Sequence, residues 1–214
     1  MPKRFWRIRV LVLAVFVAGG PLAGCDDGDD KLENRNPGNN DLQVVVAFGD
    51  SITNGKHCNC TPYPARLSGL IGKTVHNAGI PGSRATSSTG RAQQLINQRR
   101  PAFMLILYGV NDIIMGGSVD GILAALNEMV AICKNNNVVP VLATYPVPIT
   151  DHQVFGPGTL ALNAGIRSVA SSQGIRCVDL EREFGGDPSL YLSDGLHPND
   201  AGTQIIAMAF ADLY

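Results

Sequence analysis

The chain has 214 residues, enough for one domain with a sizeable core and too few for two comfortable ones. Apolar residues make up 45% of it and charged residues 16%, which is typical of a globular protein and excludes a disordered one. The formal net charge of −1 gives no electrostatic footprint for nucleic acid, so no nucleic-acid partner is expected.

Residues 1–24 have the pattern of an export signal. Basic residues stand near the start, a largely apolar run follows at 8–18, and small residues lead up to Cys25. The apolar run is too short for a comfortable membrane span. Residues 22–25 (Leu-Ala-Gly-Cys) resemble the bacterial lipobox, in which the signal is removed before the cysteine and that cysteine is acylated. Because several acyl chains anchor a protein stably, we expect a protein held in the bacterial cell envelope through Cys25 and facing the periplasm.

An ordinary cleaved signal followed by a coincidental cysteine is the alternative, and the choice of inner or outer membrane stays open. The segment 26–41 holds six acidic and two basic residues among Gly, Asn and Pro. That composition buries little apolar surface, so we interpret residues 25–41 as the lipidated cysteine and a flexible acidic tether. We expect the folded domain to occupy residues 42–214.

From residue 42 onward the pattern alternates between strand and helix. We predict strands at 44–48, 74–76, 102–108, 138–144 and 175–180, and helices at 63–71, 86–98, 119–134, 159–172 and 199–213. Such alternation predicts a parallel sheet with right-handed crossovers and helices on both faces. The expected architecture is a three-layer α/β/α sandwich of about five strands.

Ser51 follows the first predicted strand, in the segment Phe48-Gly49-Asp50-Ser51. Ligands of open α/β sheets bind outside the carboxyl ends of strands, so Ser51 is a candidate nucleophile. A serine after a strand can equally serve a turn or a helix cap. A nucleophile also requires a base, an orienting acid and donors for the oxyanion.

Asp194 is the candidate orienting acid and His197 the candidate base. They lie three residues apart in a turn before the last predicted helix, where the carboxylate can reach the imidazole Nδ1–H and leave Nε2 free to act toward Ser51. An Asp-x-x-His pair alone is a weak signal, because the aspartate can simply form an Asx-turn.

Two further segments end strands at the same rim of the predicted sheet. Gly79 follows the second strand and can present a backbone N–H, while Asn111 follows the third and can present a side-chain N–H. With the Ser51 N–H they make three donors around one point, which is the composition of an oxyanion hole.

These four segments together resemble the GDSL, or SGNH, hydrolase family. The matching segments are 49–53 (Gly-Asp-Ser-Ile-Thr), 77–79 (Asn-Ala-Gly), 109–112 (Gly-Val-Asn-Asp) and 194–199 (Asp-Gly-Leu-His-Pro-Asn). The departure is Ile52, where leucine is commonest. The resemblance implies a flavodoxin-like fold, with Ser51 as nucleophile, His197 as base, Asp194 as its orienter, and the oxyanion hole at Ser51, Gly79 and Asn111. Asp50 and Asp112 are expected to brace the loops.

The cysteines and remaining histidines indicate structure more than chemistry. His57, Cys58 and Cys60 fall short of a four-ligand structural metal site, so we expect no metal and no cofactor. Exported proteins more often oxidise their cysteines, and apart from Cys25 four are left for two disulfides in three possible connectivities: Cys58, Cys60, Cys133 and Cys177. Cys133 and Cys177 lie in apolar runs and can equally be free core thiols. His76 and His152 are expected to be structural or solvated.

The substrate is the least determined feature. Loops 113–118 and 145–157 are expected to wall a shallow site. Candidate acyl-lining residues are Met115, Tyr145, Val147 and Phe155, although such side chains more often serve local packing. We expect a monomeric esterase for short to medium acyl chains acting on a small ester or lipid, with lysophospholipid or thioester cleavage as candidate activities. Deacetylation of an envelope carbohydrate is the alternative within enzymes. A non-catalytic, lipid-anchored binding protein on the same fold is the alternative of another class.

Overall fold

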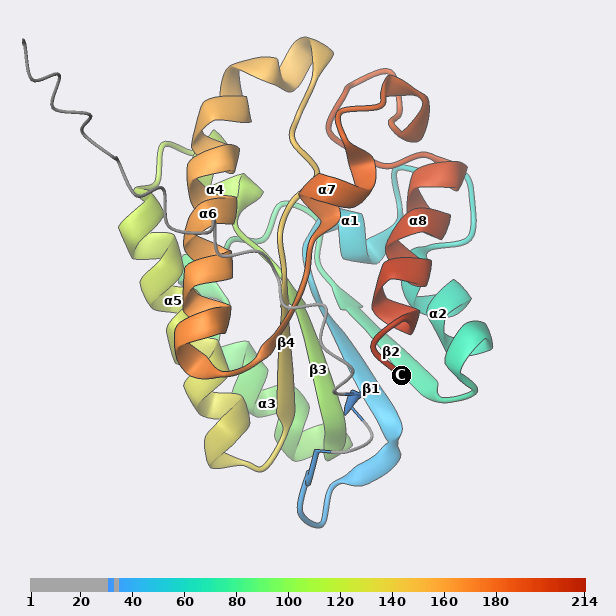
Figure 1. Cartoon of the computed structure of the whole chain (residues 1–214), viewed down its shortest axis with the longest axis vertical. Helices are drawn as coiled ribbons and strands as arrows, with labels where there is room; N and C mark the ends of the chain where they lie inside the picture. Colours follow the sequence, from blue (N-terminus) through green and yellow to red (C-terminus); the bar gives the residue numbers. More distant parts are fainter. Residues whose placement is uncertain (1–30, 33–34) are drawn as a thin grey trace, which may run out of the picture.

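Five strands form one sheet between two layers of helices in the computed structural model (Figure 1). The structure describes residues 31–32 and 35–214, so the predicted signal 1–24 and the predicted lipidation site at Cys25 lie outside the described residues. The strands are β1 (Asp41–Gly49), β2 (Thr74–Gly79), β3 (Pro101–Leu107), β4 (Val139–Ala143) and β5 (Arg176–Val178).

The strand order is β2-β1-β3-β4-β5, and every pairing is parallel. This is the flavodoxin-like order, and it confirms the predicted three-layer α/β/α fold. Successive strands are added on one side of β1 (β2) and then on its other side (β3), so the strand order switches between β1 and β3, and Gly49 pairs with Gly79 on one side and Leu107 on the other. Ligand sites of such sheets lie at this switch point, outside the carboxyl ends of the strands.

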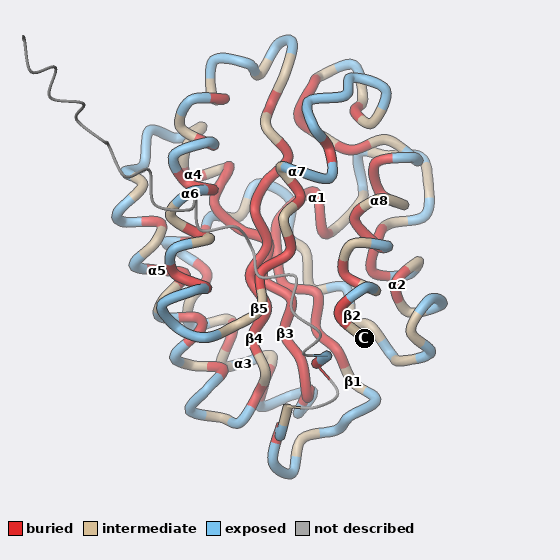
Figure 2. The backbone as a smooth tube through the Cα atoms, viewed as in Figure 1, coloured by how far each residue is buried: buried red, intermediate tan, exposed pale blue. Residues whose placement is uncertain are grey.

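Successive residues of the central strands point to opposite layers, and both layers are apolar. Val45 and Ala47 of β1 face α2 (Tyr63–Ile71) and α8 (Asp200–Ala211). Val46 and Phe48 face the other layer, which contains α3 (Thr89–Arg99), α5 (Val119–Asn135) and α6 (Gly156–Gln173). Burial is therefore continuous along β3 and the carboxyl-terminal half of β1 (Figure 2). None of the helices in the described part of the chain is long and apolar enough to cross a membrane.

Several short elements escape the sequence prediction. Three of the described helices have at most five residues, too few to show a helical period: α1 (Ser51–Asn54), α4 (Val110–Ile114) and α7 (Leu180–Phe184). The 3₁₀ turns Ala85–Ser87, Thr150–Phe155 and Pro188–Leu190 are also too short for such a pattern. The predicted strand 175–180 ends at Val178, because the Asp179 side chain caps α7. The predicted helix 86–98 begins later, at Thr89, after the first of these 3₁₀ turns.

The described part of the expected tether packs against the domain. Leu32 is fully buried, and its N–H donates to the Leu213 carbonyl over 2.9 Å. The Asn40 side chain donates to the Asn136 carbonyl over 2.9 Å, immediately before β1 begins at Asp41. These contacts add residues before position 42 to the folded unit.

Candidate active site

Ser51 is the first residue of α1, directly beyond the carboxyl end of β1. The Asp50 carboxylate caps this helix by accepting from the Ile52 N–H, and Gly55 ends it at φ +76°. The turn before it is tight, since a Cβ on Gly49 would lie 2.1 Å from the Thr53 hydroxyl and 2.7 Å from the Leu107 carbonyl. The Ser51 side chain is therefore held at the rim of the sheet, with the residue 6% exposed.

Asp194, His197 and Ser51 form one continuous chain of hydrogen bonds. His197 Nδ1 lies 2.6 Å from Asp194 Oδ2, and His197 Nε2 lies 3.0 Å from Ser51 Oγ. The structure thus brings together the three residues that the sequence analysis paired across 146 positions. With Asp194 accepting from Nδ1–H, the Nε2 lone pair faces the serine hydroxyl and can take its proton.

The Asp194 carboxylate is fixed by the loop that carries it. Its Oδ1 accepts from the backbone N–H groups of Leu196 and His197 at 2.9 and 3.0 Å. Burial alone would raise the pKa of Asp194, but the bonds from the His197 ring and from these two N–H groups hold it below 3.8. Gly195, at φ +68°, lets the loop turn where a Cβ would lie 2.1 Å from the Ile149 carbonyl oxygen.

His152 is a site residue that sequence reasoning missed. Its Nδ1 lies 2.7 Å from the Asp194 carbonyl oxygen, and the neighbouring Ile149 N–H donates to the Gly195 carbonyl over 2.8 Å. The segment after β4 therefore braces the loop of the base. No spacing in the sequence links His152 to Asp194, because 42 positions separate them and the contact depends on the tertiary fold.

The expected oxyanion donors converge on the same rim but already have acceptors within the protein. The Gly79 N–H donates to Asn77 Oδ1 over 3.0 Å. Asn111 Nδ2 donates to Asp50 Oδ2 over 3.2 Å and to the Ser83 carbonyl over 3.0 Å. An oxyanion must therefore share these N–H donors with their present acceptors or replace those acceptors. The Ser51 N–H is different, because an N–H in the first turn of a helix such as α1 has no acceptor within the helix.

Asp50 is fully buried and links the serine turn to Asn111. Besides Asn111, its Oδ2 accepts from the Tyr145 hydroxyl at 2.5 Å. Burial raises the pKa of Asp50 to about 6, against the hydrogen bonds from Tyr145 and the Ile52 N–H and the charge of His197, which lower it. The predicted bracing role of Asp50 is confirmed, as is that of Asp112, which accepts from the backbone and side chain of residues 85–86.

Tyr145 is wrongly predicted as an acyl-lining residue. Its side chain is fully buried, and its hydroxyl donates to Asp50 and to the Leu107 carbonyl, the latter over 3.1 Å. Of the other candidates, Met115 is 71% exposed at the end of α4, and Val147 and Phe155 are half-buried.

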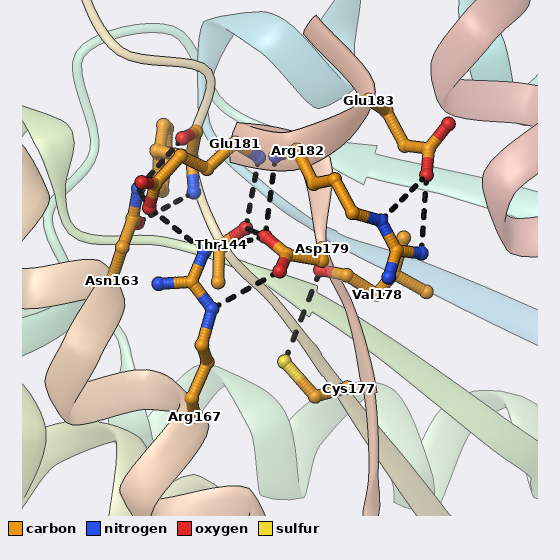
Figure 3. A network of polar contacts seen from close by, with 10 residues as sticks. Thr144, Asn163, Arg167, Cys177, Val178, Asp179, Glu181, Arg182 and Glu183 are labelled. Atoms are coloured by element: carbon orange, nitrogen blue, oxygen red, sulfur yellow. Dashed lines mark hydrogen bonds and ion pairs between the residues drawn. The ribbon is translucent and has the colours of Figure 1, made fainter. Parts of the chain in front are cut away.

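Figure 3 shows a polar network that joins Asn163 and Arg167 of α6 to Asp179 and Glu181. The Asn163 amide accepts from the Tyr145 N–H and donates to the Tyr145 carbonyl, both at 2.8 Å. Asn163 also donates to Glu181, and Arg167 bridges Glu181 and Asp179 at 2.8 and 2.6 Å. The network connects the end of β4 to α6 and α7 and holds the Tyr145 backbone through both its N–H and its carbonyl.

The cysteines follow one of the connectivities in part. Cys58 and Cys60 form a disulfide across a single intervening residue, which removes both thiols as metal ligands. Cys133 is a buried free thiol, as one alternative expected, so it does not pair with Cys177. Cys177 is disulfide-bonded, and its expectation as a free core thiol is therefore wrong. Within residues 31–32 and 35–214 no three His, Cys, Asp or Glu side chains gather as a candidate metal site.

Comparison with known proteins agrees with this geometry. The GDSL-like lipase/acylhydrolase family model matches residues 47–205, which contain all four motif segments, and the chain belongs to this family. No curated protein sequence matches the chain.

Solved structures with a similar fold share about a fifth of their residues with this chain. A lipolytic protein of the G-D-S-L family from Desulfitobacterium hafniense is 21% identical with a TM-score of 0.71, over 80% of this chain and 99% of that one. An acetylxylan esterase from Geobacillus stearothermophilus is 21% identical with a TM-score of 0.69, over 80% and 94%. A GDSL-like lipase from Bacteroides thetaiotaomicron is 20% identical with a TM-score of 0.66, over 78% and 85%.

Proposed function

We propose that this GDSL-family hydrolase is a serine esterase that cleaves carboxylic esters of short to medium acyl chains through an acyl-enzyme. The observation that carries the proposal is the hydrogen-bonded line from Asp194 through His197 to Ser51, at 2.6 and 3.0 Å. A serine hydroxyl becomes a nucleophile when a positioned base removes its proton, and this arrangement provides that base.

The geometry supports a two-step reaction. Ser51 Oγ attacks the ester carbonyl carbon as its proton passes to His197 Nε2, and the carbonyl oxygen becomes an oxyanion near Ser51 N–H, Gly79 N–H and Asn111 Nδ2. The carbonyl reforms, the alkoxide leaves with the proton from His197, and the acyl group stays on Ser51. Water that His197 deprotonates then attacks this ester and releases the acid. Asp194 remains a carboxylate throughout and stabilises the imidazolium.

Deacetylation of a carbohydrate is the second candidate. The pocket beside Ser51 is small, and its lining is formed in part by His57, Cys58 and Pro198, so it favours a short acyl group. The related fold from Geobacillus stearothermophilus belongs to an acetylxylan esterase, which is consistent with an acetyl substrate. The same triad serves both reactions, so chain-length preference and the alcohol part of the ester distinguish them.

The test is hydrolysis of p-nitrophenyl esters from acetate to palmitate. We expect activity highest at short chains, and Ser51→Ala is expected to lower kcat by more than about 1000-fold because the nucleophile is lost. Ser171→Ala, on an exposed part of α6, is the matched control and should behave as the parent protein. Turnover that survives Ser51→Ala would exclude Ser51 as nucleophile. No serine-dependent turnover on any ester, with no labelling of Ser51 by a phosphonate, would favour the binding-protein alternative.

We further propose that acyl chains on Cys25 anchor the protein to the envelope membrane. The support is the lipobox-like segment 22–25 and the export signal before it. Cys25→Ala is expected to move the protein from the membrane fraction to the soluble fraction of cells, and its retention in membranes would contradict the anchor.

A further inference from the structure

His57 stacks on the candidate base. The rings of His57 and His197 lie nearly parallel, with centroids 4.0 Å apart and an interplanar angle of 21°. Both bonds of the His197 ring, to Asp194 and Ser51, are made through its edge. The stacked ring therefore covers a face that these edge bonds leave open.

A closed loop holds His57 in this place. Gly55 ends α1 in the left-handed conformation, and its N–H donates to the Ser51 carbonyl over 2.9 Å. Immediately after His57, the Cys58–Cys60 disulfide joins residues whose Cα atoms are 5.1 Å apart. Cys60 Sγ lies 3.7 Å from the hydroxyl of Thr203, a buried residue of α8.

This attachment connects the two halves of the catalytic pair. The loop begins at the helix that carries Ser51 and is fixed to α8, the helix that starts just after His197. Ser51, His57, Cys58, His197 and Thr203 line one small pocket. The His57 ring is thereby placed on His197 by the same elements that place the nucleophile and the base.

The chemistry of His57 suits a neutral stacking partner. Burial lowers the pKa of His57, and the charges of His197 and Lys56 lower it further, while Asp194 raises it. A neutral aromatic face attracts a cation, and His197 becomes a cation whenever it takes the serine proton. Rotation of the His197 ring away from this position would lower the reaction rate, because small misplacements of catalytic groups reduce it strongly.

We propose that His57 is a positioning residue for the general base: its ring, held by the Cys58–Cys60 loop, keeps the His197 imidazole in the plane that joins Asp194 to Ser51. This inference rests on the proposed esterase function. His57 acts through its stacking on His197, so its effect is on how often His197 is correctly oriented when Ser51 attacks.

The test uses three substitutions that separate the ring from its polarity. At pH 8, His57→Ala is expected to lower kcat for p-nitrophenyl acetate about 10-fold with KM changed less than about 2-fold. His57→Phe keeps a stacking ring and should restore kcat to within about 3-fold of the parent. His57→Gln keeps polarity without a ring and should resemble His57→Ala. The melting temperature of each variant checks that the fold is retained.

The loop is tested separately with Cys58→Ser/Cys60→Ser, which should lower kcat to a similar extent because His57 is no longer held. Unchanged kcat in His57→Ala, equal rescue by Gln and Phe, or a loss that appears only in KM would overturn the positioning role. Unchanged kcat in the double variant would overturn the part assigned to the disulfide. Absence of Ser51-dependent turnover in the parent protein would instead refute the proposed function, so the two failures are distinguishable.

Discussion

Replacing Tyr145 by phenylalanine should destabilise the protein in a pH-dependent way. The substitution removes a 2.5 Å hydrogen bond to the buried Asp50 carboxyl. Hydrogen bonds to a charged group contribute about 1.5–3 kcal/mol and neutral ones about 0.5–1.5 kcal/mol. Because the folded-state pKa of Asp50 is about 6, the carboxyl is mostly ionised at pH 8 and mostly protonated at pH 5. We expect a loss of about 2 kcal/mol at pH 8 and about 1 kcal/mol at pH 5.

Asp50 also determines how the stability of the parent protein changes with pH. The pKa of Asp50 is raised from 3.8 to about 6 on folding, so its contribution favours the folded state at low pH and is lost as the pH rises between these values. The difference corresponds to about 3 kcal/mol, which Asp50→Asn should recover in part at pH 8.

Urea unfolding of the parent protein and of the Tyr145→Phe variant at pH 5 and pH 8 measures the effect of this substitution. The same substitution in the Asp50→Asn background is the matched control, because no titrating carboxyl is left beside residue 145. There the loss in unfolding free energy should be equal at the two pH values. An equal loss at both values in the parent background, or a larger loss at pH 5, would refute the assigned charge state of Asp50.

Three further substitutions probe the oxyanion side and its support. Asn111→Ala should lower kcat about 100–1000-fold if its N–H bonds the oxyanion, and an unchanged kcat would remove it from the hole. Gly79→Ala places a Cβ 2.2 Å from the backbone of α1, so it should cost about 1–3 kcal/mol in urea unfolding and lower kcat, whereas Gly90→Ala, with open space around it, should do neither. Asn163→Ala leaves the backbone N–H and carbonyl of Tyr145 without their side-chain partner and should cost about 2–4 kcal/mol, and a loss below 0.5 kcal/mol, about the least that one hydrogen bond contributes, would contradict its clamping role.

The centre of the sheet was predictable because its strands are buried on both faces. β3 is an unbroken apolar run, and the valine-rich middle of β1 has the same pattern. The alternation with helices then gave the parallel three-layer architecture. The short helices α1 and α4 were not predictable, since caps and tight turns determine them in place of any periodic pattern.

The triad was predictable for a different reason from its supports. The chemistry of Ser51, Asp194 and His197 can be read directly from their segments. Ser51 follows a strand, the other two lie in the loop before the last helix, and the structure joins all three by hydrogen bonds. His152 and Tyr145 act through contacts with Asp194 and Asp50 that depend on tertiary packing. Their residue types fit many neutral roles, so no signal in the sequence favours these partners.

The segment that follows β4 connects the two halves of the site. Tyr145 holds Asp50, which in turn accepts from Asn111 on the oxyanion side. A few residues later His152 contacts the Asp194 carbonyl on the side of the base. Since this segment was expected to wall the substrate pocket, substitutions there would be assigned to specificity and looked for in KM. From these contacts we expect a change in kcat instead, because both the proposed oxyanion donor and the proposed orienting acid depend on where the segment lies.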